Sequence, residues 1–157
     1  MTLDRELEFA VGLAPAAVTC RPAGPDDGGS VLRLYEEWGY GGGIAAGDVL
    51  RVLDAGSCVV GVVRLTREHA HTVLRGMYVS PAWRGRGLGR LLLRDSVAQL
   101  GGDAYCLPYA HLEGFCRQAG FESCPDTDAP AFLRDRVAAY RWTGKSYLIM
   151  RRKHIRD

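Results

Sequence analysis

A glycine-rich run with interleaved arginines stands where an apolar strand pattern ends and a helical pattern begins. The strand pattern ends at Ser80-Pro81, and the run reads Trp83-Arg84-Gly85-Arg86-Gly87-Leu88-Gly89-Arg90. Alternate glycines keep side chains away from the backbone amides, and the following helix adds unpaired N–H groups and the positive end of its dipole. Arginine guanidinium groups bind phosphate oxygens through paired hydrogen bonds. The run therefore predicts a binding site for a pyrophosphate or a similarly charged group.

The spacing of the glycines argues against three other phosphate-binding loops. The dinucleotide fingerprint G-x-G-x-x-G needs a glycine where Arg90 stands. The nucleoside-triphosphate loop has one candidate, Gly144-Lys145-Ser146, but Ala139 stands where its first glycine belongs. The kinase-type loop joins two strands, whereas this run begins a helix.

Two segments resemble motifs of the GNAT-type N-acetyltransferase superfamily. Arg84 to Gly89 fits the pattern R/Q-x-x-G-x-G/A of the acyl-CoA pyrophosphate loop, and Val79-Ser80-Pro81 precedes it as the family's Val-x-Pro does. Phe115-Cys116-Arg117-Gln118-Ala119-Gly120-Phe121 resembles the family's Phe-Tyr-x-x-x-Gly-Phe segment. Two motifs in the right order are more specific than a glycine run alone. The resemblance covers roughly residues 17 to 124.

The resemblance implies a single α+β domain over residues 1–157, with a mixed, mostly antiparallel sheet flanked by helices. It implies that His71 to Val79 and Ala104 to Leu107 are central strands that splay apart and admit the pantetheine arm of acetyl-CoA. A bulge at Gly76 would expose backbone amides to the cofactor. The expected cofactor-binding residues are therefore those of the loop, Arg84 to Arg90, together with Met77, Tyr78 and Val79.

Acetyl transfer to an amine requires a base, because an ammonium group with a pKa near ~10 must first lose a proton. Glu36 and Glu37, at the end of the first predicted helix, are the candidate bases, and His111 is a third. Each of these side chains also has a plainer interpretation as a solvated surface residue.

The family's general acid is a tyrosine, and Cys116 stands in its place. Three interpretations follow: Cys116 is a substitute acid, it is inert core beside Leu112 and Phe115, or Tyr109 or Tyr105 replaces it. A thiol is a weaker hydrogen-bond donor than a phenol, and coenzyme A is a good leaving group. We favour inert core among the three.

The acceptor pocket is less constrained by the sequence. Trp38 and Tyr40 are expected to border it, and Arg64 and Arg75 on adjacent strands are suited to bind a carboxylate. The predicted reaction moves an acetyl group to a small-molecule or amino-acid-like amine by direct attack in a ternary complex. The alternatives are an acyl-CoA-binding module that has lost turnover and a protein N-acetyltransferase.

Hydrophobic periodicity places these residues on a series of elements. We expect a first strand at Val18–Arg21, a helix from Asp26 or Asp27 to Trp38, and a meander of three antiparallel strands. Residues 1–14 have the spacing of an amphipathic helix, which would act as an accessory arm or a homodimer contact. The remaining expected elements are strands Val49–Leu53, Cys58–Leu65, His71–Val79, Ala104–Leu107 and Ser146–Met150, and helices Leu88–Leu100, Leu112–Ala119 and Ala129–Trp142.

Composition indicates an ordinary globular protein. Of its 157 residues, 47% are hydrophobic and 24% charged, and the net charge of +2 is too small to favour a nucleic-acid surface. Five cysteines without a C-x-x-C pair predict neither a disulfide framework nor a metal site. No run has transmembrane length or the charge of a secretory leader, so we expect a cytoplasmic protein without membrane contact.

Overall fold

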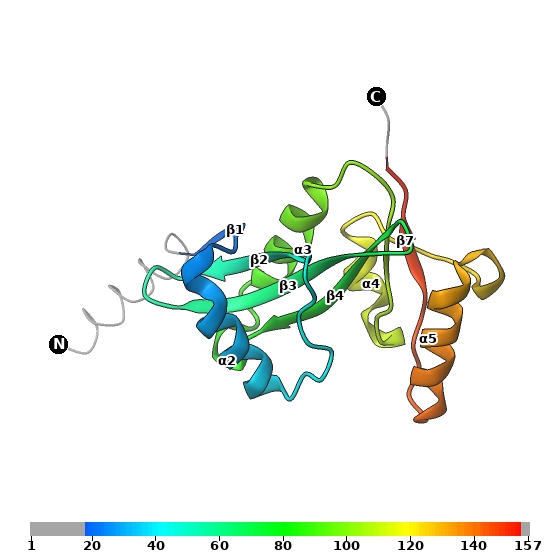
Figure 1. Ribbon diagram of the computed structural model, residues 1–157, viewed down its shortest axis with the longest axis horizontal. Coiled ribbons are helices and arrows are strands. Elements are labelled where there is room, and N and C mark those ends of the chain that lie inside the picture. Colours follow the sequence, from blue (N-terminus) through cyan, green and yellow to red (C-terminus); the bar gives the residue numbers. More distant parts are fainter. Residues whose placement is uncertain (1–17, 155–157) are drawn as a thin grey trace.

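The computed structural model describes residues 18–154, which form one seven-stranded sheet with helices on both faces (Figure 1). The strands are β1 (Thr19–Pro22), β2 (Val49–Asp54), β3 (Val59–Glu68), β4 (His71–Val79), β5 (Ala104–Cys106), β6 (Glu122–Ser123) and β7 (Met150–Arg152). They lie in the order β1-β2-β3-β4-β5-β7-β6. This architecture confirms the predicted α+β class. The helix expected over residues 1–14 lies outside the described residues.

Four α-helices accompany the sheet: α2 (Gly28–Trp38), α3 (Leu88–Ala98), α4 (Glu113–Arg117) and α5 (Ala131–Trp142). Helix α2 ends at Gly39, which adopts the left-handed conformation with φ +76° and donates its N–H to the carbonyls of Glu36 and Tyr35. Among the described helices, none combines the length and the apolar character needed to cross a membrane.

The sheet opens between β4 and β5. These two strands pair in parallel, but only over Thr72–Leu74 of β4 and Ala104–Cys106 of β5. Strand β4 continues to Val79 and stays paired with β3, whereas β5 ends at Cys106. The second half of β4 therefore has no strand partner on its β5 side in the described part of the chain, and the predicted splay is confirmed.

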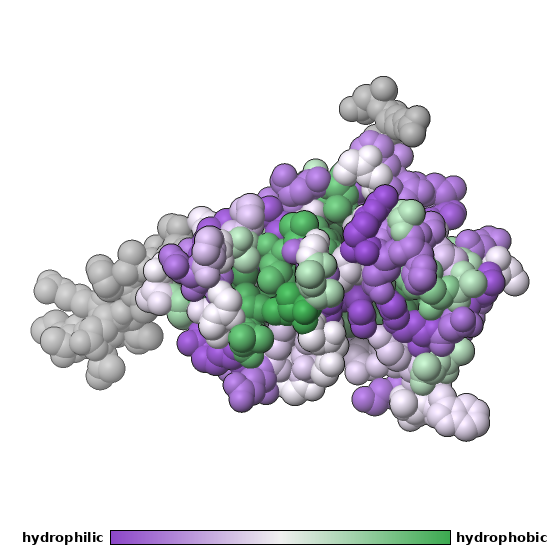
Figure 2. All heavy atoms as spheres, in the orientation of Figure 1, coloured by the Kyte–Doolittle hydropathy of each residue, from purple (hydrophilic) through white to green (hydrophobic). Residues whose placement is uncertain are grey.

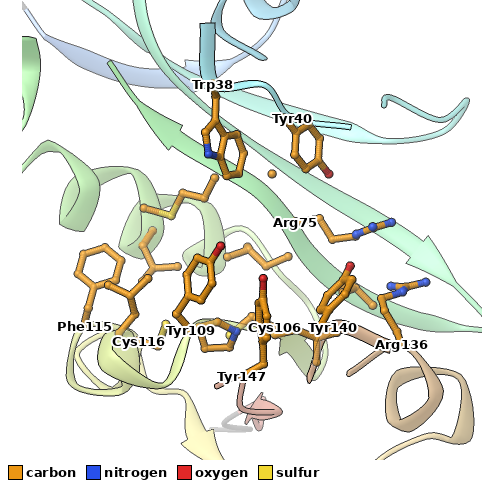
Figure 3. Close-up of a pocket in the computed structure, with 18 residues that line it drawn as sticks. Trp38, Tyr40, Arg75, Cys106, Tyr109, Phe115, Cys116, Arg136, Tyr140 and Tyr147 are labelled. Atoms are coloured by element: carbon orange, nitrogen blue, oxygen red, sulfur yellow. The ribbon is translucent and has the colours of Figure 1, made fainter. Parts of the chain in front are cut away.

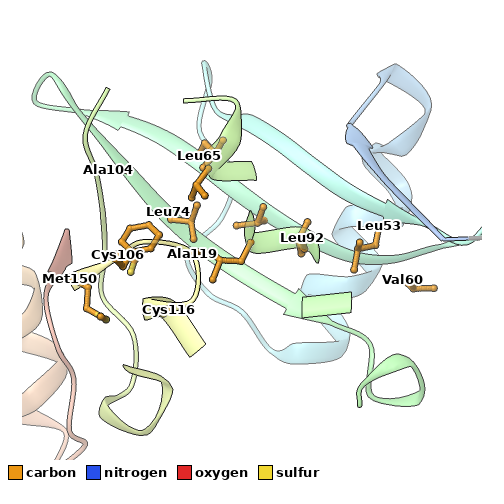
Figure 4. Close-up of a cluster of buried hydrophobic side chains, with 14 residues drawn as sticks. Leu53, Val60, Leu65, Leu74, Leu92, Ala104, Cys106, Cys116, Ala119 and Met150 are labelled. Carbon is orange, nitrogen blue, oxygen red and sulfur yellow. The ribbon is translucent and has the colours of Figure 1, made fainter. Parts of the chain in front are cut away.

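Alternating strand residues assign α2 and α3 to opposite faces. Side chains of neighbouring strand residues point to opposite faces of a sheet. Val52 is buried in a cluster with Val31 and Leu34 of α2, whereas the next residue, Leu53, is buried in a cluster with Leu92 of α3 (Figure 4). In Figure 2 hydrophobic residues gather near the middle of the visible face, and hydrophilic residues surround them.

Helix α5 lies on the same face as α2. Residues paired across two strands share a face, and Val62 of β3 pairs with Tyr78 of β4 in the cluster of α2. Alternate residues of a strand share a face, so Arg64 and Thr66 of β3 lie on the same face as Val62. Thr66 pairs with Val73 of β4. Val73 is buried with residues of α5. One face of the sheet is thus covered by α2 and α5, with the middle of β3 and β4 between them.

The final strand differs from the prediction of Ser146–Met150, because β7 begins only at Met150. Residues before it do contact the segment after β5: the Ala110 N–H donates to Ser146 O at 2.9 Å and the Leu148 N–H to Pro108 O at 2.9 Å. Pro108 has no N–H to donate, so it interrupts the ladder, and only an isolated bridge, Tyr109 to Tyr147, forms beyond it. This irregular pairing carries both tyrosines to the mouth of the splay.

Candidate active site

The glycine loop, residues 83–90, exposes its backbone at the start of α3. Gly85 and Gly87 both adopt the left-handed conformation, with φ of +79° and +78°, and Gly87 is the N-cap of α3. A Cβ added at either glycine would meet no atom within 4 Å, so the space over both residues is open. A left-handed backbone favours glycine because other residues are strained there. The loop has the geometry that its sequence predicted for an anion site.

Three arginines surround this loop, and none of them is paired with a carboxylate in the part of the chain that the structure describes. The Arg84 guanidinium lies over the Tyr78 ring at 5.3 Å, and its Nε donates to Val79 O at 2.8 Å. The Arg86 guanidinium lies over the Trp83 ring at 4.9 Å. Within residues 18–154, no carboxylate lies within 4.0 Å of the Arg84, Arg86 or Arg90 guanidinium. Their positive charges are available to an anionic ligand at the start of α3.

A cavity of about 360 Å³, the main cavity, passes through the sheet at the splay. Its walls include residues of β4 and of the segment that follows β5. On the face of α3 and α4 it is lined by Leu74, Met77, Leu93, Leu112, Phe115 and Cys116. On the face of α2 and α5 it is lined by Trp38, Tyr40, Arg75, Arg136, Tyr140 and Tyr147 (Figure 3). Two molecules that enter from opposite faces would meet inside it.

The glycine loop adjoins the α3 side of this cavity. A Cβ added at Gly89, in the first turn of α3, would lie 3.5 Å from Phe115 Cζ and 3.7 Å from Met77 Cε. Both of these side chains line the main cavity. A ligand with its phosphates on the loop therefore has a short path into the splay.

A β-bulge at Gly76 and Met77 forms part of the cavity wall. Val62 pairs with Tyr78 and Arg64 with Arg75, so Gly76 and Met77 together oppose the single residue Val63. Gly76 has φ +57°, and its carbonyl accepts a hydrogen bond of 2.8 Å from the Tyr35 hydroxyl. A Cβ at Gly76 would lie 2.8 Å from that hydroxyl oxygen, so only glycine fits. The bulge that the sequence predicted at Gly76 is present.

Cys116 lies at the boundary between the main cavity and the core. It is 6% exposed and belongs to the α3 cluster with Ala119 and Leu92 (Figure 4). Its thiol is hydrogen-bonded to that of Cys106, which also lines the cavity. This interaction and burial raise the pKa of Cys106 well above its usual value, and the same interaction lowers the pKa of Cys116. Cys116 therefore combines a place in the core with a place in the cavity wall.

Tyr109 reaches the same cavity from the segment after β5. Its ring packs on Tyr147 with centroids 4.7 Å apart, and the Lys145 ammonium lies 5.7 Å from its ring centroid. The hydrogen bond to Tyr147 and the nearby Lys145 lower the pKa of Tyr109. Of the other two candidates for proton transfer, Tyr105 is buried in the α5 cluster away from the main cavity, and His111 is exposed and stacks on Tyr109.

The two candidate carboxylates lie outside the cavity wall. Glu36 and Glu37 are both exposed on α2. Glu37 accepts hydrogen bonds from the Tyr78 hydroxyl at 2.8 Å and the Ser80 hydroxyl at 3.3 Å. Its neighbour Trp38 does line the cavity and stacks on Tyr78, with ring centroids 5.3 Å apart. Glu37 is thus one residue from the cavity, whereas no contact ties Glu36 to it.

Arg64 is buried in an ion pair beneath the acceptor side. The Arg64 and Asp48 side chains are only 2% and 4% exposed, and Arg64 Nη2 lies 2.7 Å from Asp48 Oδ2. Arg64 Nη1 also donates to the Tyr40 hydroxyl at 2.6 Å. Tyr40 in turn stacks on Trp38, with ring centroids 4.9 Å apart and planes 5° apart. Arg64 therefore supports the aromatic wall and is not available to a ligand.

The opposite wall comes from Tyr109, which the sequence offered as a replacement acid, and from Arg136, Tyr140 and Tyr147, which sequence reasoning missed. Figure 3 shows the hydroxyl groups of Tyr109, Tyr140 and Tyr147 pointing toward the wall that carries Trp38, Tyr40 and Arg75. Arg136 and Tyr140 are four residues apart on α5, a spacing that places both on one side of a helix. That spacing was the signal available in the sequence, but it did not show which side of α5 faces the splay.

Comparisons with known proteins agree with this geometry. Residues 46–123 match the family model of the acetyltransferase (GNAT) domain. A search of curated proteins gives no match. The fold is shared with solved structures of low identity, among them an acyl-CoA N-acyltransferase from Pseudomonas aeruginosa, with TM-score 0.60, 17% identity and coverage of 86% of this chain and 98% of the other.

Two further structures show how widely this fold is used. The N-acetylglutamate synthase of Neisseria gonorrhoeae, complexed with coenzyme A and N-acetyl-glutamate, has TM-score 0.65 and 21% identity over 88% of this chain, which spans only 35% of the synthase. The ribosomal-protein-S18-alanine N-acetyltransferase of Escherichia coli has TM-score 0.63 and 14% identity, over 89% of this chain and 96% of the other. The matched domain, the fold and the two sequence motifs agree, and residues 46–123 belong to the acetyltransferase (GNAT) domain family.

Proposed function

We propose that this protein transfers an acetyl group from acetyl-CoA to the amine of a small molecule bound in the main cavity. The observation that carries the proposal is the cavity itself, which crosses the sheet at the splay and has the glycine loop beside one mouth. The other mouth is lined by aromatic and guanidinium groups, which suit a small polar molecule with an apolar body.

In this proposal the pyrophosphate of acetyl-CoA binds the amides of the glycine loop and Arg84, Arg86 and Arg90. The pantetheine arm enters the splay along Met77, Tyr78 and Val79, where β4 has no β5 partner. The thioester carbonyl is polarised by the backbone N–H groups of the bulge at Gly76 and Met77. The structure of the gonococcal synthase with bound coenzyme A supports a coenzyme A site in this fold.

The acceptor amine attacks the thioester carbon directly, and the carbon–sulfur bond then breaks to release coenzyme A. Among the described residues that line the main cavity, none is aspartate, glutamate or histidine. We therefore propose that Glu37, next to Trp38, removes the ammonium proton through water. Glu37 is exposed to solvent, which is consistent with a relay through water.

Tyr109 is our proposed proton donor to the leaving thiolate. Its lowered pKa lies closer than that of an ordinary phenol to the pKa of about 8.5 of a thiol, which favours proton transfer between them. The Tyr109 hydroxyl points into the main cavity (Figure 3). Cys116 also lines this cavity and has a lowered pKa, but it is largely buried beside Cys106, and a thiol is a weaker hydrogen-bond donor than a phenol.

Removing the two candidate acids separately tests this assignment. We expect Tyr109→Phe to lower kcat by about 100-fold, because a positioned general acid contributes about 10²–10⁴. Cys116→Ala should leave kcat unchanged. Steady-state thiol release measures both, and Tyr105→Phe, which removes a phenol outside the cavity, is the matched control. A loss of kcat in Cys116→Ala with normal turnover in Tyr109→Phe would assign the acid role to the thiol.

Calorimetry and thiol release together separate the enzyme from its alternatives. Acetyl-CoA should bind, and free thiol should appear only when a suitable small amine from a panel is added. Tight binding without release on any amine would indicate a binding module. Release only with a peptide amine would indicate a protein acetyltransferase, as in the Escherichia coli enzyme of the same fold.

A further inference from the structure

Arg75 stands where two cavities meet. It lines the main cavity of about 360 Å³ and also a second cavity of about 150 Å³, formed by the loop before β2, the second half of β3 and Arg75 itself. No carboxylate of the described residues lies within 4.0 Å of its guanidinium. In Figure 3 this guanidinium lies at the end of the main cavity where Arg136 and Tyr140 stand on the opposite wall.

The two neighbouring arginines, Arg64 and Arg136, are paired with carboxylates. Arg64 is paired with Asp48 at 2.7 Å, and Arg136 forms two hydrogen bonds with Glu68, of 2.6 and 3.2 Å. Those bonds lower the pKa of Glu68 to about 2, with smaller contributions from the Thr66 hydroxyl and the positive charge of Arg75, so its carboxylate stays charged. Within residues 18–154, Arg75 therefore has no ion pair of its own, and the Glu68 carboxylate that is bonded to Arg136 acts on it only from a longer distance. Arg67, the other arginine beside the second cavity, is exposed to water.

The position of Arg75, opposite a second arginine, does not stabilise the fold. Arg75 and Arg64 pair directly across β4 and β3, on the same face of the sheet. Like charges directly opposite each other destabilise a sheet. Asp48 offsets the charge of Arg64 but not that of Arg75. An anion bound to Arg75 would therefore reduce the remaining electrostatic repulsion between the two arginines. A site of this kind points to a ligand group with one negative charge.

We infer that the acceptor amine carries a carboxylate, which binds the Arg75 guanidinium, so that the substrate is an amino acid or a similar carboxylate-bearing amine. The inference rests on the proposed function. A carboxylate matches the planar fork of a guanidinium with two parallel hydrogen bonds. A phosphate dianion would need a second unpaired cation, and the other arginine of the main cavity, Arg136, is paired with Glu68, as Arg64 is with Asp48. The aromatic walls, with Trp38 stacked on Tyr40, accommodate the apolar body of the acceptor.

Matched pairs of amines test this inference. The pairs are phenylalanine and phenethylamine, tyrosine and tyramine, and leucine and 3-methylbutylamine; phosphoethanolamine supplies a phosphate. Calorimetry on the coenzyme A-saturated protein gives Kd, and thiol release from acetyl-CoA gives kcat/KM. At least one carboxylate-bearing member should bind about 100-fold more tightly than its partner, the difference expected for a hydrogen-bonded charged group.

Variants of Arg75 make the test specific. Arg75→Gln should abolish the preference for the carboxylate, and Arg75→Lys should restore part of it. Arg94→Gln, which removes an exposed arginine of α3, is the matched control and should keep the preference. Because Arg75 opposes Arg64, Arg75→Gln should melt at or above the wild-type temperature, so that its loss of binding cannot come from unfolding.

Each result has a distinct meaning. Equal affinity within every pair, a preference that survives in Arg75→Gln, or tighter binding of phosphoethanolamine than of any carboxylate would overturn the inference. A carboxylate preference in calorimetry without thiol release would support the Arg75 site and contradict the proposed acetyl transfer. Turnover of amines without regard to the carboxylate would support the transfer and overturn the Arg75 site.

Discussion

Replacing Gly87 with valine is expected to weaken acetyl-CoA binding by about 100-fold or more. Gly87 has φ +78°, and a left-handed conformation costs a residue with a Cβ about 1–2 kcal/mol. The valine side chain would also project into the open space over the loop, where the phosphates are expected. Each lost hydrogen bond to a charged group costs about 1.5–3 kcal/mol, so the combined effect reaches two orders of magnitude in Kd.

Gly56→Val is the matched control for this variant. Gly56 has φ +87° in the turn between β2 and β3, and a Cβ there would also meet no atom within 4 Å. The two variants therefore carry similar backbone strain, but Gly56 is not part of the glycine loop. Calorimetry should show wild-type affinity for acetyl-CoA in Gly56→Val. Wild-type affinity in Gly87→Val as well would mean that the loop does not hold the pyrophosphate.

Replacing Asp48 with alanine is expected to lower the free energy of unfolding by about 3–5 kcal/mol, the usual cost of removing one partner from a buried ion pair. The Asp48 carboxylate accepts hydrogen bonds from Arg64 Nε at 2.9 Å and from the Ala45 N–H at 2.8 Å. Without it, Arg64 keeps a buried charge with only the Tyr40 hydroxyl as a partner, opposite Arg75. Urea unfolding measures the effect.

Two comparisons isolate the contribution of the buried charge. Asp126→Ala breaks the Arg141–Asp126 pair, whose side chains are 39% and 47% exposed, and should cost less than about 1 kcal/mol. The double variant Asp48→Ala, Arg64→Met should recover part of the loss, because it removes the orphaned guanidinium. If Asp48→Ala is as mild as Asp126→Ala, the Arg64–Asp48 pair is not the support of the aromatic wall that we describe.

The cofactor side of the site was predictable from the sequence because its signals are local. The glycines, the arginines and the strand end at Pro81 lie within ten consecutive residues, and each has a physical meaning at its own position. The bulge at Gly76 was foreseeable in the same way, since a glycine inside an apolar strand pattern indicates either a bulge or a close contact. The structure has both a bulge and a close contact at Gly76, because the Tyr35 hydroxyl oxygen would lie only 2.8 Å from a Cβ at this position.

The acceptor side was less predictable because distant segments build it. Tyr147 reaches the cavity only because Pro108 interrupts the ladder between β5 and β7, and Arg136 and Tyr140 only because α5 packs on the face that α2 also covers. Arg64 and Arg75 on adjacent strands were both candidates to bind a carboxylate, with the plainer role of sheet-surface charge favoured more for Arg64 than for Arg75. Asp48, sixteen residues before Arg64, separates their roles by neutralising one of them. No spacing in the sequence predicts the Arg64–Asp48 ion pair.

The stoichiometry of one reaction tests the central claim most directly. Wild-type protein is mixed with acetyl-CoA and a carboxylate-bearing amine, and mass spectrometry quantifies acetylated amine and free coenzyme A over time. Acetyl transfer in the main cavity predicts one acetylated amine for each coenzyme A released, with no release when the amine is omitted. Release of coenzyme A without acetylated amine, or no release with any amine that binds, would contradict it.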